Sequence, residues 1–248
     1  MTFKFLSCLN VEPDELHVLW LGVVQYFMGS ILWLLVYRCM CKTPKANMAD
    51  VWREVTEHYH NNQTPTQFSN LDLKSFCNPD KHDKAFPHLK GRGAEVKWLV
   101  EPIANVWKKH KRTNTHDNRV LAALIALLAI IRTIDEYAHE MVYPRGVPQV
   151  FMKQIEEFLK QYNWLADQAD SRKDLLFSNV PKLHVCWHLG DRAKYLSTRR
   201  GACFIDEDYQ RHLKILAQSC AHGTPLHQIF VSMMFKYRWA LDYEHVRI

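Results

Sequence analysis

The chain has 248 residues, of which 48% are hydrophobic and 23% are charged, proportions that are ordinary for a folded globular protein and exclude a disordered chain. Only 8 Gly and 10 Pro interrupt it, which favours long helices over an all-β fold with many turns. The formal net charge of +6 is compatible with a polyanionic partner, although many basic proteins bind no polyanion.

The seven cysteines have no framework spacing, and we find no cleavable signal peptide ahead of them, so a reduced intracellular compartment is the simpler expectation. Cys39 and Cys41 form only an isolated C-x-C pair, which is too little for a zinc ribbon. The sequence also lacks a phosphate-binding glycine loop, a G-x-S-x-G nucleophile elbow and a set of kinase motifs. Nucleotide hydrolysis and serine hydrolase chemistry therefore lose support.

The first predicted elements are a short strand over 3–11 and a helix that begins at Pro13-Asp14. An aspartate at this place is typical of a helix start, where Asp14 or its neighbour caps free backbone amides. The apolar opening of the chain resembles a strand from the middle of a domain. We therefore expect the sequence to come from a partial reading frame.

The next segment, residues 16–37, carries no charge and is long enough to span a membrane, with basic residues on one side only. The alternative is a helix buried in the core of a large domain, in which Gly22 and Gly29 allow close packing. The rest of the chain has no second convincing span, which favours the buried helix. Both interpretations stay open on the sequence alone.

Helical spacing and turn signals predict seven further helices beyond this segment. Their expected ranges are 48–61, 93–111, 118–141, 148–170, 182–195, 206–222 and 225–243. The polar, proline-containing residues 62–87 predict a connecting stretch with a short extended piece at 71–76. The fold class is therefore mainly α, a helical bundle-like chain with at most one or two short strands.

Acidic residues stand at the starts of two predicted helices. Asp14 precedes the apolar helix, and Asp206, Glu207 and Asp208 form a triplet at the start of a later one. The helix dipole favours acids at these places, so capping is the ordinary interpretation of each.

Two histidines form the other candidate group. His184 and His188 are four positions apart and share one face of a helix, a spacing that can hold a metal. Cys186 lies between them in sequence but would point away from that face, and no glutamate stands between the histidines as in metalloprotease helices. We therefore expect packing or hydrogen bonding from this pair instead of zinc binding.

Two segments, taken together, resemble DDE transposases of the CACTA and Plavaka type. The first is DELHVLWLGVVQYFMGSILWLL, which resembles the block around the second catalytic aspartate, followed by an aliphatic-His step, Leu-Gly-Val and a long apolar helix. The second is KLHVCWHLGDRAKYLSTRRGACFIDEDYQRHLKIL, which resembles a Lys- and His-containing helix that leads to a Phe-x-x-Glu step with the third catalytic carboxylate. The matching positions are Asp14, Leu16, His17, Leu21, Gly22, Val23, Lys182, His184, His188, Phe204, Glu207, Leu213 and Lys214. The intervening KGRGAEVKWLVEPIANVWKKH resembles the helical insertion of these enzymes.

This resemblance implies a site for Mg²⁺ or Mn²⁺. DDE enzymes use three carboxylates to hold two divalent metals about 3.5–4 Å apart, which activate water or a 3′-hydroxyl. Asp14 and Glu207 would be two of the catalytic, metal-binding carboxylates. The supporting residues would be His17, Lys182, His184 and His188.

The resemblance also implies a DNA partner. The basic run at the end of the insertion would contact phosphates, while a solvated helix end is an equal alternative for it. Its residues are Lys108, Lys109, Lys111 and Arg112. No small-molecule substrate is evident.

On this resemblance, residues 1–42 would be the remnant of an RNase H-like core, 43–180 its helical insertion, and 181–248 the C-terminal helices with the Glu motif. The first catalytic aspartate would lie upstream of Asp14, and none of the 13 residues before Asp14 is Asp. We therefore expect a C-terminal transposase fragment that neither cuts nor joins DNA alone, and a nuclear location for it.

Two alternatives remain on the sequence. One is a single-pass membrane protein anchored through 16–37, with its basic C-terminal side in the cytoplasm. The other is a helical interaction scaffold without chemistry.

Overall fold

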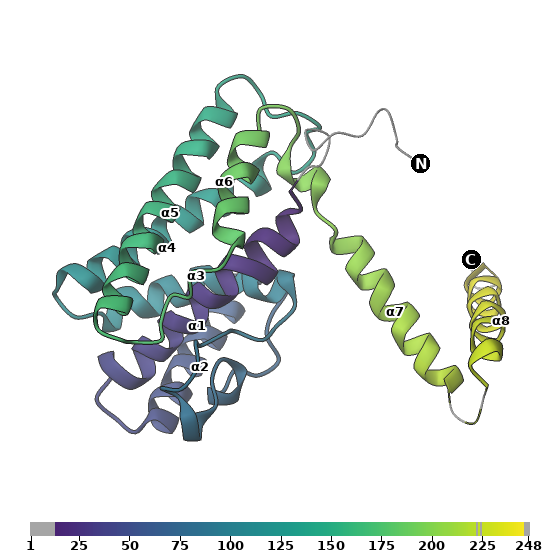
Figure 1. Ribbon diagram of the computed structural model, residues 1–248, viewed down its shortest axis with the longest axis horizontal. Coiled ribbons are helices and arrows are strands. Elements are labelled where there is room, and N and C mark those ends of the chain that lie inside the picture. The colour runs from purple at the N-terminus through teal and green to yellow at the C-terminus, as the bar shows by residue number, and fades with distance from the viewer. Residues whose placement is uncertain (1–12, 222, 224, 246–248) are drawn as a thin grey trace. The chain divides into compact units, whose positions relative to one another are not determined.

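The computed structural model describes residues 13–221, 223 and 225–245, without the side chains at 205–208, 211, 212, 226 and 240–245. The strand predicted over 3–11 lies outside the described residues. The chain forms two compact units, Met1–Ala202 and Cys203–Ile248, which are described separately (Figure 1). The two expected boundaries at 42/43 and 180/181 both fall inside the first unit, and the three-part division stays a prediction.

One continuous helical segment forms the centre of the first unit. It consists of η2 (Leu16–Val23), α1 (Val24–Leu34) and η3 (Leu35–Cys39), with π-helical turns in both η elements. This segment is the one described helix that is long and apolar enough to cross a membrane, yet 89% of its most apolar 18-residue window is buried inside the unit. Burial of apolar side chains against protein stabilises a core helix in the same way that lipid would stabilise a span. The buried position supports the expectation of a core helix.

Two glycines of this central segment allow the close packing that the sequence predicts. A Cβ atom at Gly29 would lie 2.8 Å from the carbonyl carbon and oxygen of Pro87, in the long connection between α2 and α3. A Cβ atom at Gly22 would lie 2.6 Å from the His17 carbonyl oxygen and 2.8 Å from Cδ of Lys182. Real side chains do not fit at such distances, so the central helix is approached on two sides because these residues are glycine.

Five helices pack around the central segment (Figure 1). They are α2 (Pro44–Asn61), α3 (Gly93–His110), α4 (Thr115–Glu136), α5 (Val147–Ser171) and α6 (Lys182–Arg192). The helices α2 and α3 pack against each other, α4 packs against both α3 and α5, and α6 packs against α5 and η2. The aromatic centre of the core is Phe27, whose ring contacts those of Phe158, Tyr162 and Phe177. Helices distant in sequence therefore share one apolar core with the central segment.

The connection between α2 and α3 contains two 3₁₀ turns, η4 (Leu73–Ser75) and η5 (Pro79–Lys81). The first replaces the extended piece expected over 71–76, and that expectation was wrong. Asp72 explains the difference, because its Oδ1 accepts hydrogen bonds from the backbone N and the hydroxyl of Ser75. Such short polar side chains stabilise local turns in place of extended backbone.

The second unit is a pair of helices, α7 (Phe204–Ala221) and α8 (Leu226–His245), which pack against each other. A 3₁₀ turn, η6 (Thr198–Gly201), precedes them at the end of the first unit. The described residues are mainly helical and contain no strand, which confirms the mainly α fold class.

Candidate functional site

Asp14 lies at the beginning of η2, with 21% of its side chain exposed. Its Oδ1 accepts a hydrogen bond of 2.9 Å from the backbone N of Leu16, and its carbonyl oxygen accepts one of 2.9 Å from the backbone N of Val18. Its Oδ2 contacts Nδ1 of His17. The carboxylate therefore caps the helix, as the sequence predicts, and also fixes the histidine of the same motif.

Glu15, the neighbour of Asp14, is fully buried. Its Oε1 accepts a 2.7 Å hydrogen bond from Nε1 of Trp20, while its Oε2 has no hydrogen-bond partner in the described part of the chain. Burial raises the pKa of this carboxyl, and the Trp20 hydrogen bond and the charge of Lys97 oppose that effect only in part. We did not predict this residue from the sequence. The available signal was its spacing of four from Leu19, which places a charge on the apolar face of the helix.

The buried ammonium group of Lys97 lies near the same tryptophan. The side chain of Lys97, on α3, is 6% exposed and forms an ion pair with Asp135 of α4. Its Nζ lies 6.0 Å from the centre of the Trp20 ring. Trp20 therefore lies between a buried carboxyl, with which it forms a hydrogen bond, and a buried ammonium group close to its ring.

The second matched segment meets the first at a kink. The backbone leaves helical geometry at Leu21 and Gly22, and Nζ of Lys182 donates a 2.9 Å hydrogen bond to the Leu21 carbonyl oxygen. These two residues are 161 positions apart in sequence. Because Gly22 has no Cβ, the Lys182 side chain can pass directly over this turn. The fold thus brings together two segments that the resemblance pairs.

The 3₁₀ turn η6 lies near Pro13, the residue before Asp14. Pro13 lines a small cavity together with Arg192 at the end of α6 and Gly201 at the end of η6. Glu207 follows six positions after Gly201, inside α7, in the second unit, and its side chain lies outside the described residues. Within the first unit, the structure therefore places η6 near the beginning of η2.

The two histidines of α6 contact each other. Their Nε2 atoms are 3.0 Å apart, His184 is exposed, and His188 is half-buried. Cys186 between them is fully buried, and burial raises the pKa of its thiol to about 12. The thiol therefore stays protonated in the core, and the histidines form the accessible group of this helix.

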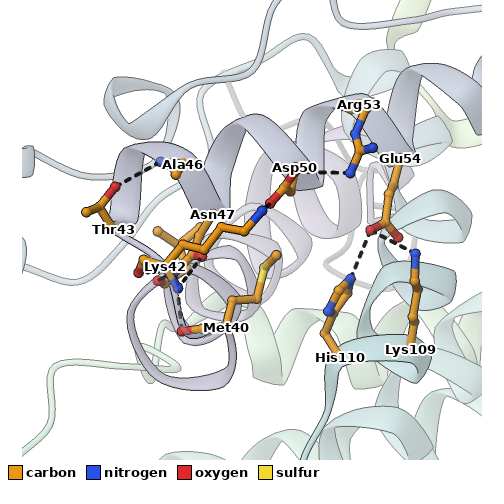
Figure 2. Close-up of polar contacts among 11 residues, drawn as sticks. Met40, Lys42, Thr43, Ala46, Asn47, Asp50, Arg53, Glu54, Lys109 and His110 are labelled. Atoms are coloured by element: carbon orange, nitrogen blue, oxygen red, sulfur yellow. Dashed lines mark hydrogen bonds and ion pairs between the residues drawn. The ribbon is translucent and has the colours of Figure 1, made fainter.

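The predicted DNA-contacting run begins at the end of α3, where Lys109 and the neighbouring His110 contact Glu54 of α2 (Figure 2). Oε1 of Glu54 lies 3.1 Å from Nζ of Lys109 and 2.9 Å from Nε2 of His110. Burial would raise the pKa of the Glu54 carboxyl, but the hydrogen bonds from His110 and Lys109 outweigh it and lower the pKa. Lys109 is thus engaged in joining two helices.

Two further residues of the run, Lys111 and Arg112, also have hydrogen-bond partners within the chain. Arg112 donates hydrogen bonds from its backbone N and its Nε to Oδ2 of Asp117, at 2.9 and 3.0 Å. Lys111 donates a 2.8 Å hydrogen bond to Oδ1 of Asn118, and Lys108 is exposed. Three of the four predicted phosphate contacts therefore have partners inside the first unit, and their role toward DNA stays a prediction.

Among the described side chains, no group of three or more His, Cys, Asp and Glu could hold a metal ion. Glu207 is outside that set. The Asp14 carboxylate fits a Mg²⁺ or Mn²⁺ ligand in type, because these ions prefer oxygen atoms, and in position, because it reaches the surface of the unit.

Comparisons with protein-family models, with curated proteins and with solved structures gave no match. Functional proposals therefore rest on the residues of the chain itself.

Proposed function

We propose that this chain derives from a DDE transposase and that Asp14 and Glu207 supply two carboxylates of a divalent-metal site acting on DNA. The observation that carries this proposal is the hydrogen bond from Lys182 to the Leu21 carbonyl. It joins the two matched segments at the Leu-Gly-Val step of the first one.

The local geometry also supports the proposal. The Leu-Gly-Val step lies at the kink where Leu21 and Gly22 leave helical geometry, and uncommon backbone conformations occur frequently at functional sites. The cluster of Glu15, Trp20 and Lys97 anchors this turn from inside the unit. A carboxylate that must hold a cation is best placed on such a rigid support.

Each residue would have a defined part in such a site. Asp14 and Glu207 would hold the ion, and His17 would orient the Asp14 carboxylate through its Nδ1 contact. When bound, Mg²⁺ or Mn²⁺ would activate water or a 3′-hydroxyl toward a phosphodiester. Because the family's first catalytic aspartate has no match in the residues of this chain, we propose that Asp14 and Glu207 do not cut DNA without a further carboxylate.

The core position of the segment Leu16–Cys39 favours this function over the membrane anchor. Transfer of that helix into a bilayer would remove it from its contacts with α3 and α6. The anchor alternative therefore predicts loss of folding without detergent, whereas the transposase proposal predicts that the whole chain folds in plain buffer.

The test is the affinity of the full chain for Mn²⁺, measured by the electron paramagnetic resonance signal of the free ion. We expect Asp14→Asn and Glu207→Gln each to weaken binding at least about tenfold, with less than additive effects in the double variant because both touch one site. Asp208→Asn is the matched control on the same helix and should leave the affinity unchanged.

Two outcomes would contradict the proposal. If neither Asp14→Asn nor Glu207→Gln changes Mn²⁺ affinity, these carboxylates hold no metal. If the purified chain cleaves DNA with Mg²⁺ and Glu207→Ala abolishes the cleavage, the proposed inactivity of the isolated chain is wrong.

A further inference from the structure

The two histidines of α6 have a geometry that suits joint metal binding. His184 and His188 are separated by one helical turn, with ring centres 4.5 Å apart and ring planes at 81°. Their Nε2 atoms are 3.0 Å apart, within hydrogen-bonding distance of each other. Without a metal, one imidazole must donate its proton to the lone pair of the other.

This separation fits two ligands on one ion. Two imidazole nitrogens bound at about 2.0–2.1 Å and separated by roughly 90–110° at the metal lie about 2.9–3.4 Å apart. The observed 3.0 Å is within that range. A divalent ion could therefore replace the shared proton with almost no rearrangement of the rings.

The backbone that carries the pair is fixed before any metal binds. The opposite face of α6 is buried through Leu183, Cys186 and Leu189, and Lys182 ties the start of the helix to the Leu21 carbonyl. Ligands on such a packed helix lose little conformational freedom when they bind an ion, which raises affinity.

The accessible side of the pair opens toward solvent. His184, but not its partner His188, lines a groove of about 650 Å³ between α5 and α6, together with Asp167, Asn163 and Trp187. The carboxylate and the amide can accept hydrogen bonds from metal-bound water. The groove therefore provides room for the water molecules that would complete the coordination.

We propose that His184 and His188 form a two-histidine site for a divalent transition-metal ion, completed by water in the groove. Imidazole ligands favour Cu²⁺ most, then Ni²⁺ and Zn²⁺, and they bind Mg²⁺ poorly. Cys186 is not a ligand, since it is buried on the opposite face of the helix. This site is distinct in ligand type from the carboxylate site proposed for Asp14 and Glu207.

The test uses the full chain with Cu²⁺ as the probe, followed by electron paramagnetic resonance and calorimetric titration. We expect a 1:1 complex whose spectrum shows two imidazole nitrogens. His184→Ala and His188→Ala should each reduce the nitrogen count to one and weaken binding at least about tenfold. Ni²⁺ and Zn²⁺ should compete with Cu²⁺, and Mg²⁺ should not.

The matched control is the double variant His58→Ala/His60→Ala. These histidines are two positions apart on α2, so they lie on different faces and cannot share an ion. The control should keep the two-nitrogen spectrum. A loss of binding in the control equal to that in His184→Ala and His188→Ala, or fewer than two nitrogens in the parent spectrum, would overturn the proposal. Neither result depends on Mn²⁺ binding by Asp14 and Glu207, so the two proposals fail separately.

Discussion

Two regions of the molecule carry candidate chemistry, and they use their charges differently. Near Asp14, the key contact joins Lys182 to a backbone oxygen 161 positions away, and the α6 histidines stay accessible. In the basic run, Arg112 is bound to Asp117 only five positions on, and Lys109 is bound to Glu54 of the neighbouring helix. Residues of a dense basic run can thus form ion pairs that stabilise the fold. An isolated lysine, in contrast, can join two segments that are distant in sequence.

The largest effect is expected from removing Asp117, the acid that binds Arg112, which tests whether the basic run stabilises the fold. Asp117→Ala deletes a fully buried carboxylate that accepts hydrogen bonds from the backbone and the side chain of Arg112. We expect a loss of about 2–3 kcal/mol in unfolding free energy, since several hydrogen bonds to a charged group are lost and the backbone N of Arg112 loses its acceptor. Urea unfolding measures this. Asp170→Ala, at an exposed position, should change stability by less than about 0.5 kcal/mol. Equal effects would mean that the run has no structural role.

The contact between the two motif segments can be tested through Gly22. In Gly22→Ala the new methyl would clash with the His17 carbonyl and with Lys182, so we expect a loss of about 2 kcal/mol. Gly190→Ala is the matched control in α6, because its methyl would meet only the flexible end of Met152 closely. Thermal unfolding should show a clearly smaller loss for the control. A Gly22→Ala variant as stable as the parent would mean that the segments are not closely packed.

The two regions should also respond to pH with opposite sign. The hydrogen bonds of Arg112 and His116 outweigh burial and lower the pKa of Asp117 from 3.8 to about 2, so its stabilisation is lost as pH falls through that range. Burial raises the pKa of Glu15 above 4.5, so the folded state holds this proton more tightly and stability falls as pH rises past 4.5.

Unfolding free energies of Glu15→Gln between pH 4.5 and pH 8 test the second half of this expectation. The fall in stability with rising pH should be smaller in Glu15→Gln than in the parent. Glu156→Gln, at an exposed position, should follow the parent profile. An unchanged profile in Glu15→Gln would show that the buried carboxyl does not titrate differently in the folded state.

The smallest effect is expected at Lys108, the exposed member of the basic run. Lys108→Glu should change stability by less than about 0.5 kcal/mol. If the run contacts DNA phosphates, the slope of log affinity against log salt concentration for a short duplex should fall by about 1. Lys160→Glu on α5 is the charge-matched control and should leave the slope unchanged. An unchanged slope in Lys108→Glu would contradict the predicted DNA contact.

Much of the fold follows from local patterns in the sequence. Apolar spacing and glycine and proline signals predict the helices, because these features act within a few residues. The short turn at Asp72 was missed, since one side-chain hydrogen bond decided between two backbone conformations. The burial of the central helix was favoured by its glycines and by the lack of a second convincing span, because its composition alone suits lipid equally well.

The site is harder to predict, since it depends on contacts between distant residues. Asp14 as a helix cap follows from local sequence, but its neighbour Glu15 gave little sign that it would be buried against Trp20. The internal partners of Lys109 and Arg112 depend on where α2 and α4 lie. Charge patterns therefore identify candidates, and the fold decides which charges remain accessible.

An experimental structure of the whole chain with Mn²⁺, located by its anomalous scattering, would decide most directly whether Asp14 and Glu207 act together. We predict an Mn²⁺ ion bound to both, with the two carboxylates within about 8 Å, close enough to bracket a metal pair. Mn²⁺ bound elsewhere, or the two carboxylates farther apart than one metal pair can bridge, would contradict the proposed transposase origin of this site.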